Sequence, residues 1–280
     1  MKKTIAFLLA ALFALFLFGC GAKSPDNSGS TGEKTTEETK PLTVTVTFPE
    51  GYTALEIAER LEENGVCAKK DFMKAVQSSS LAQEFGLSDG MKNTDKRAFL
   101  LEGYIFPDTY EFYTDESAQS VLRRFLRNTQ SKLTDEMKKK AEKLGYSMDE
   151  IITLASVIQA EAGIQKEMSK VSSVLHNRLE SADYGLLQCD VTIHYVNENI
   201  LTSPYLEGEK SRFAEYYNTY KRKGLPVGAI CNPGLEAINA ALEPEKTDYF
   251  YFVTDKDWNY YYASTYEEHL KNCKKCGIEL

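Results

Sequence analysis

Glu161 is the residue whose position in this sequence most clearly points to chemistry. Ile151, Leu154 and Ile158 are spaced to form one apolar face of a helix, and the next position on that face is occupied by Glu161. Burial disfavours the charged form of a carboxyl group and raises its pKa, which is how a protein keeps a proton donor protonated near neutral pH. The pattern therefore predicts a general acid. A structural carboxylate that ends the helix and pairs with an Arg or with backbone N–H groups fits the same pattern.

Two helices are expected to position this acid. Ser147 and Glu150 have the spacing of a capping box, which places the start of the first helix. The second helix is expected over residues 167–179, with an apolar stripe that makes these two helices the core of the region. Arg178, near its end, fits a site residue and a structural donor equally well.

Residues 1–20 have the pattern of a bacterial lipoprotein signal peptide. Two lysines precede an apolar run that is short for a membrane-spanning helix, and the run ends at Cys20, the expected lipid attachment site. An uncleaved N-terminal anchor and an ordinary secretory signal are the alternatives, and all three place the body outside the cytoplasm. Residues 21–41 are mostly Ser, Thr, Gly, Glu and Lys, which predicts a flexible tether.

Composition and cysteine spacing exclude several classes of function. The chain has 41 acidic and 33 basic residues, and it lacks the dense basic stripe that nucleic-acid binding requires. Five cysteines follow Cys20: Cys67, Cys189, Cys231, Cys273 and Cys276. The last two have the spacing of half a zinc site or of a redox motif, but no second such pair follows. We therefore expect no metal and no cofactor, and either a strained local disulfide or two free thiols at the C-terminal end.

The order of predicted elements indicates an α+β fold in two parts. Residues 42–48 alternate as a strand does, Thr53 with Glu56 begins a helix, and another helix follows from Asp71. This predicts a small β-α-α unit over residues 42–90, packed on a mixed α/β catalytic domain over residues 91–280.

Within the larger part, five further regions can be assigned from pattern. We expect short strands around a turn at Pro107-Asp108, a long helical region over 118–144, functional or merely connecting loops over 195–234, a helix over 235–242, and a final hairpin from 249–253 and 260–262. The aromatic residues beside carboxylates in 100–112 suit sugar binding, although an ordinary strand pair with an aromatic core fits them equally.

Seven short motifs occur in one characteristic order. They are Leu101-Glu-Gly-Tyr-Ile-Phe-Pro-Asp-Thr-Tyr110, Leu154-Ala-Ser-Val-Ile-Gln-Ala-Glu-Ala162, Asn177-Arg-Leu179, Leu187-Gln-Cys-Asp-Val-Thr192, Tyr217-Asn-Thr-Tyr220, Gly224-Leu-Pro226 and Asn232-Pro-Gly234. With them the chain resembles the endolytic murein transglycosylases of the YceG-like family from Leu42 to about Asn272. The resemblance implies enzymes that cut peptidoglycan glycan strands internally, at the outer face of the cytoplasmic membrane and beside peptidoglycan synthases. It also implies that the unit at 42–90 is LysM-like.

The resemblance assigns the catalytic acid to Glu161, while Gln159 stands where the motif has an earlier Glu. The residues expected to line a sugar-binding groove around it are Gln188, Asp190, Asn218, Tyr220 and Asn232, with Glu102 contributing from the earlier strand region. The chain departs from the family pattern at Cys189, Val191, Val227 and Tyr260. None of these departures replaces the acid.

Three functions remain open from the sequence. A lytic transglycosylase needs one carboxyl group, which protonates the glycosidic oxygen between N-acetylmuramic acid and N-acetylglucosamine and then deprotonates the C6 hydroxyl to close a 1,6-anhydro ring. A hydrolytic muramidase would pair Glu161 with a second carboxylate at about 5–9 Å, for which Glu102, Asp108 and Asp190 are candidates. A non-catalytic lipoprotein that binds glycan strands or organises the synthesis complex is the third.

Overall fold

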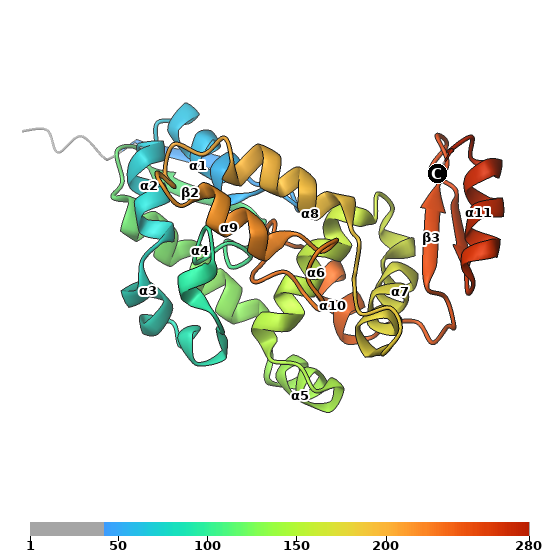
Figure 1. The fold of residues 1–280 in the computed structure, drawn as a ribbon. Coiled ribbons are helices and arrows are strands. Elements are labelled where there is room, and N and C mark those ends of the chain that lie inside the picture. Colours follow the sequence, from blue (N-terminus) through green and yellow to red (C-terminus); the bar gives the residue numbers. More distant parts are fainter. Residues whose placement is uncertain (1–41, 280) are drawn as a thin grey trace, which may run out of the picture. The chain divides into compact units, whose positions relative to one another are not determined.

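The computed structural model describes residues 42–279, so the predicted signal peptide, the tether and Cys20 lie outside the described residues. Helices make up most of this part, together with two small two-stranded sheets (Figure 1). Among residues 42–279, every helix is too short or too polar to cross a bilayer. The predicted α+β class is thereby confirmed in its coarse form, and the LysM-like character of residues 42–90 stays a prediction.

The first sheet joins two segments that are far apart in the sequence. Strand β1 (Thr43–Thr47) pairs antiparallel with β2 (Thr109–Tyr113), with Val46 opposite Tyr110. The expected strand pair around Pro107-Asp108 is therefore wrong: only the segment after this turn is a strand, and its partner is β1. The predicted boundary at residue 90 falls between these two strands.

Helices α1 (Ala54–Glu63), α2 (Lys69–Val76) and α3 (Ser79–Glu84) follow β1. The predicted capping box is present at the start of α1, where Thr53 accepts from the Glu56 N–H and Glu56 accepts from the Thr53 N–H. This closure satisfies backbone donors that the first turn leaves unpaired.

The predicted long helical region consists of two helices, α4 (Ala118–Lys132) and α5 (Asp135–Leu144). They are separated because the Thr134 side chain caps a new helix by accepting from the Met137 N–H. After α5, the predicted capping box of Ser147 and Glu150 opens α6 (Met148–Glu161).

Helix α6 lies at the centre of the larger part. Residues 151–158 are all buried, and α6 packs against α10 (Leu235–Leu242) most extensively, and also against α5 and α7 (Met168–Glu180). The predicted helices over 167–179 and 235–242 are thus confirmed, but the core around α6 is formed by more than the two helices expected.

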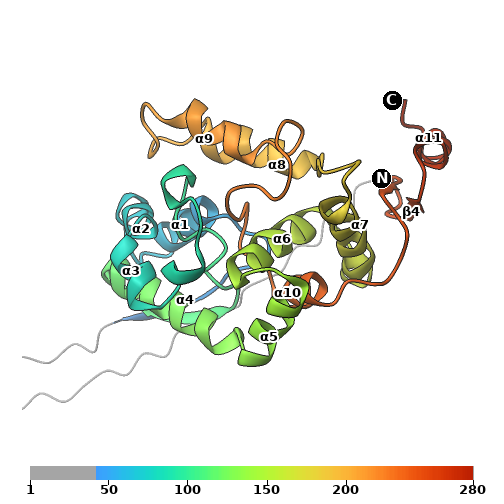
Figure 2. The same ribbon diagram turned by 60° about the horizontal axis from the view of Figure 1, so that its bottom comes forward.

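The remaining elements are shorter than α6. They are the 3₁₀ turns Ser88–Gly90, Thr94–Lys96 and Gln165–Glu167, helix α8 (Asp190–Tyr195) with its π-helical continuation Val196–Ile200, helix α9 (Lys210–Tyr217), strands β3 (Tyr251–Thr254) and β4 (Tyr260–Ala263), and helix α11 (Tyr266–Lys275). Strands β3 and β4 pair antiparallel, which confirms the predicted hairpin. Figure 2 shows α8 and α9 running along one side of α1 and α6.

Candidate active site

Glu161 is the last residue of α6, and the C-terminal hairpin fastens this end of the helix. The Tyr260 hydroxyl on β4 donates to the Glu161 carbonyl oxygen at 3.3 Å and accepts from the Gly163 N–H at 2.8 Å. The Trp258 ring covers Gly163 so closely that a Cβ there would lie 2.2 Å from it. A larger residue at this position would have to displace the exposed Trp258 ring.

Four of the predicted site residues line one cleft of about 410 Å³: Glu161, Gln188, Asp190 and Tyr220. The other walls come from α7, from the segment before α8 and from the C-terminal elements, with Arg178, Cys189, Tyr251, Tyr266 and His269 among their residues. Sequence reasoning had not selected the last three, because their contribution depends on the C-terminal hairpin packing against α7, with α11 on the other side of the hairpin (Figure 1).

The pKa of the Glu161 carboxyl group is raised to about 7. Burial is the largest cause and the negative charge of Asp190 the second, while contacts with the Cys189 thiol and the Val191 backbone N–H, and the positive charge of Arg178, act in the opposite direction. A substantial fraction of Glu161 is therefore protonated at neutral pH, as a proton donor requires.

Thr219 holds the segment that carries Gln188 and Asp190. Its hydroxyl oxygen accepts from the Cys189 N–H at 3.0 Å, and its carbonyl oxygen accepts from the Gln188 N–H at 3.2 Å. Thr219 is 1% exposed, so the two loops are locked together away from solvent. Sequence reasoning selected its neighbours Asn218 and Tyr220 but missed Thr219, whose only signal was its place inside the Tyr217-Asn-Thr-Tyr220 motif.

Asp190 and Tyr220 are joined across the cleft mouth. The Tyr220 hydroxyl donates to the Asp190 carboxylate, and both side chains are exposed. Asp190 also opens α8, where the helix dipole favours a negative charge. The carboxylate of Asp190 is thus a second acidic group near Glu161, and it faces solvent.

Asn218 lies beside the cleft but does not line it. Its side-chain oxygen accepts from the Tyr220 N–H at 3.0 Å, which shapes the turn that presents the Tyr220 ring. Asn218 thus positions Tyr220, and its own contact with a sugar stays a prediction.

Glu102 and Asn232 are placed in the interior, 2% and 0% exposed, and not in the cleft. The Asn232 side-chain oxygen accepts from the N–H groups of Gly103 and Ile105 at 2.9 and 2.8 Å, and its Nδ2 donates to Glu102 at 2.8 Å. Glu102 also accepts from the Ala54 N–H at 2.9 Å, where α1 begins. Both residues fasten loops to one another, so their expected contact with sugars is corrected to a structural role.

Arg178 combines the two roles that its sequence position left open. Its Nε donates to the Phe250 carbonyl, just before β3, at 2.6 Å and its Nη1 to the Leu187 carbonyl at 2.7 Å, which ties these two segments to α7. Arg178 also lines the cleft and lowers the pKa of Glu161 by its positive charge.

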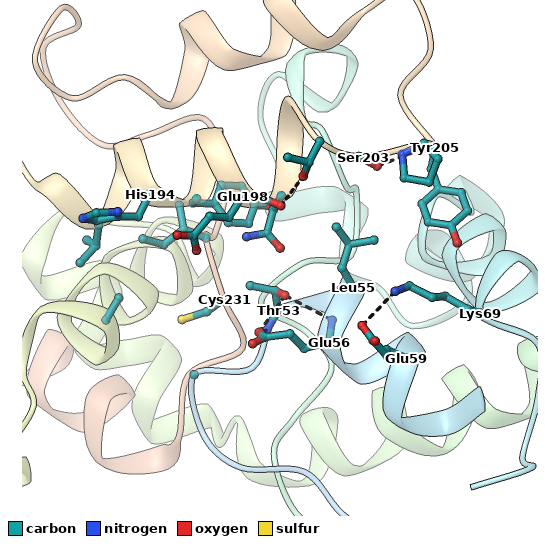
Figure 3. Close-up of a pocket in the computed structure, with 18 residues that line it drawn as sticks. Thr53, Leu55, Glu56, Glu59, Lys69, His194, Glu198, Ser203, Tyr205 and Cys231 are labelled. Atoms are coloured by element: carbon teal, nitrogen blue, oxygen red, sulfur yellow. Dashed lines mark hydrogen bonds and ion pairs between the residues drawn. The ribbon is translucent and has the colours of Figure 1, made fainter. Parts of the chain in front are cut away.

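A second groove, of about 650 Å³, is lined in part by residues that are next in the chain to residues of the cleft. Ala160 and Val191 line the groove, whereas their chain neighbours Glu161 and Asp190 line the cleft. Figure 3 shows the two walls of this groove. One wall contains Glu56 and Glu59 of α1, and the opposite wall is formed by α8 and its continuation. Consecutive residues at the end of α6 and at the start of α8 thus line two different cavities.

No metal ligand set is present among residues 42–279, since no three His, Cys, Asp or Glu side chains lie so as to hold an ion. All five cysteines of this part, Cys273 and Cys276 included, are free thiols. The sequence left a local disulfide or two free thiols open for Cys273 and Cys276, and in the structure they are free thiols.

Comparison with known proteins gives consistent matches. The model of the YceG-like family matches residues 28–275. An endolytic murein transglycosylase of Bacillus subtilis (strain 168) is 30% identical over 241 residues, which cover 82% of this chain and 64% of that protein. An endolytic murein transglycosylase of Streptococcus pneumoniae serotype 2 is 28% identical over 253 residues, which cover 85% of this chain and 45% of that protein. The chain thus spans only about half to two thirds of the length of these relatives.

A solved structure supports the same match at the level of the fold. The crystal structure of a yceG-like protein from Listeria monocytogenes superposes with a TM-score of 0.69 at 32% sequence identity. The superposition covers 81% of this chain and 75% of that one.

Proposed function

The chain belongs to the YceG-like family, and on this premise we propose that it is an endolytic peptidoglycan lytic transglycosylase. The substrate would be the β-1,4 bond between N-acetylmuramic acid and N-acetylglucosamine inside a glycan strand. The observation that carries the proposal is the carboxyl group of Glu161, with its pKa raised to about 7, in the wall of the cleft.

In the proposed reaction, the protonated Glu161 donates its proton to the glycosidic oxygen, and the bond from that oxygen to C1 of N-acetylmuramic acid breaks. The sugar passes through an oxocarbenium-like state. The Glu161 carboxylate then accepts the proton of the C6 hydroxyl while O6 forms a bond to C1. The products are a 1,6-anhydro end and a new N-acetylglucosamine end, and Glu161 is again protonated for the next cycle.

The endolytic character is supported by the groove, whose lining residues Ala160 and Val191 are chain neighbours of Glu161 and Asp190 in the cleft. A strand that enters from the groove beside α1 and leaves through the cleft beside α7 would place an internal bond at Glu161. Cutting inside a strand that is still being elongated would release it from the synthesis machinery, and we propose that the enzyme helps to terminate nascent strands in this way.

A hydrolytic muramidase is the second candidate, and the carboxylate of Asp190 in the same cleft favours it. The two are separated by incubating the full-length protein with purified peptidoglycan and determining the masses of the soluble products. We expect products with 1,6-anhydro ends, each one water lighter than a product with a reducing end. Reducing ends would identify a hydrolase, and intact strands would identify a binding protein.

Asp190→Asn is expected to move the pH dependence of cleavage. The charge of Asp190 raises the pKa of Glu161, so its removal should lower that pKa, and the protonated acid should be lost at lower pH. The alkaline limb of kcat/KM, expected near pH 7 in the wild type, should shift to lower pH. Asp135→Asn on α5, outside the cleft, is the matched control. An unchanged limb, or a shift to higher pH, would contradict the assignment of Glu161 as the acid.

We also propose that the chain is held at the extracytoplasmic face of the cell membrane by a lipid on Cys20. Its support is the sequence of residues 1–20. This location would bring the enzyme to nascent glycan strands and to peptidoglycan synthases. A Cys20→Ala variant that stays in the membrane fraction at unchanged mature mass would argue against the lipid.

A further inference from the structure

A third cavity, of about 400 Å³, lies apart from the catalytic cleft and carries a positive charge. Five of its lining side chains are basic: Lys92, Lys96, Arg97, Arg222 and Lys223. Only two are acidic, Asp149 and Glu150, which leaves a formal charge of +3 in a protein whose net charge is −8. Such a concentration of one sign of charge in a concave site attracts ligands of the opposite sign.

Three of these cations are not neutralised by carboxylates. Lys92 pairs with Glu150, and Arg97 with Asp149. Lys96, Arg222 and Lys223, by contrast, make no ion pair with any carboxylate in the part of the chain that the structure describes.

The Tyr216 ring holds two of these unpaired charges in place. The Lys96 Nζ lies 5.5 Å and the Arg222 guanidinium 5.1 Å from its centroid. Contact with an aromatic face orients a cation but leaves its charge and most of its hydrogen-bond donors available to a ligand.

Arg97 supplies an independent observation. It is 4% exposed, it lines the cavity, and its Nη1 donates to Asp149 at 2.8 Å. Its Nε is buried and makes no hydrogen bond to any of residues 42–279. Asp149 is shared with the Tyr104 hydroxyl, which donates to it at 2.8 Å. Arg97 is therefore a buried cationic part of the cavity wall, and it shares its carboxylate partner with a second donor.

We propose that this cavity binds a phosphoryl anion. A phosphate or pyrophosphate group brings several acceptor oxygens and more than one negative charge, which matches three cations without a carboxylate partner better than a single carboxylate does. The motif Gly224-Leu-Pro226 forms part of the wall, so the proposal also gives a role to a motif that the catalytic reaction does not use.

The loop that forms this wall also reaches the catalytic cleft. Tyr220 lines the cleft, and Arg222 and Lys223 line the cationic cavity. The Gly224 N–H donates to the Gly185 carbonyl at 2.9 Å, and Lys223 forms an isolated bridge with Leu186. A cell-wall enzyme at a membrane would meet two sources of such an anion. One is a pyrophosphate attached to a glycan strand, and the other is the headgroup of an anionic phospholipid.

The test is calorimetric titration of the full-length protein, held in a neutral detergent, with three water-soluble probes: inorganic pyrophosphate, glycerophosphoglycerol as the headgroup of phosphatidylglycerol, and malonate as a dicarboxylate. The double variant Arg222→Gln/Lys223→Gln should bind the phosphoryl probes about tenfold more weakly or worse, because two charge-assisted contacts are lost. Lys138→Gln/Lys139→Gln on α5 is the control of equal charge change, and its affinity should equal that of the wild type.

The relative affinities of the probes distinguish the two sources of the anion, and three other outcomes would overturn the proposal. Tighter binding of pyrophosphate points to a pyrophosphate-linked strand, and tighter binding of glycerophosphoglycerol to a lipid headgroup. The proposal would be overturned if neither phosphoryl probe bound at millimolar concentration. It would also be overturned if malonate bound as tightly as the phosphoryl probes or more tightly, or if the two double variants lost equal affinity for them. Since only binding is measured, the result does not depend on the proposed catalytic function.

Discussion

Glu161→Gln is expected to slow peptidoglycan cleavage by a factor of about a thousand. The amide keeps the volume of the side chain but has no acidic proton for the glycosidic oxygen, and it cannot accept the proton of the C6 hydroxyl. The rate is measured from the release of soluble products, with Glu180→Gln, an exposed position at the end of α7, as the control. A correctly folded Glu161→Gln protein that retains a large part of the wild-type rate would remove Glu161 from the mechanism.

The same variant reports the pKa of Glu161 through stability. Because folding raises this pKa from 4.5 to about 7, the folded state binds the proton more tightly than the unfolded state. The contribution of Glu161 to the free energy of unfolding is thus complete below pH 4.5 and is lost as the pH rises through about 7. Glu161→Gln should lack this loss, which is measured by urea unfolding at a series of pH values.

Asn232→Ala is expected to lower the free energy of unfolding by about 3–5 kcal/mol. The wild-type side chain is fully buried and satisfies the N–H groups of Gly103 and Ile105, the carbonyl of Tyr52 and the carboxyl group of Glu102. Alanine leaves these groups without their partner in a place that water does not reach. The measurement is urea-induced unfolding followed by circular dichroism.

Asn218→Ala is the matched control for this loss of stability. Asn218 is partly exposed and its side chain makes one local hydrogen bond, to the Tyr220 N–H. The cost should be within about 1 kcal/mol. If Asn232→Ala instead keeps the stability of the wild type and loses cleavage, Asn232 contacts the substrate as the sequence had predicted, and its structural role is wrong.

The sequence by itself determined the features that depend on neighbours along the chain. The helical spacing from Ile151 to Glu161 placed the acid at the end of α6, and the Ser147 and Glu150 pair fixed where that helix begins. The C-terminal hairpin and helix α10 were likewise readable. Capping, helical periodicity and strand alternation act over a few residues, so these elements need no knowledge of the rest of the fold.

Only the tertiary structure decided which polar residues near the acid face the cleft. Gln188 and Asn232 lie in similar loops rich in polar residues, yet Gln188 reaches the cleft, whereas Asn232 is bonded to backbone groups about 130 positions earlier in the chain. The strand partner of β2, the locking role of Thr219 and the cationic cavity depend equally on distant segments. The direction of a polar side chain is set by the donors and acceptors that folding brings to it, and the spacing of residues carries no information about those partners.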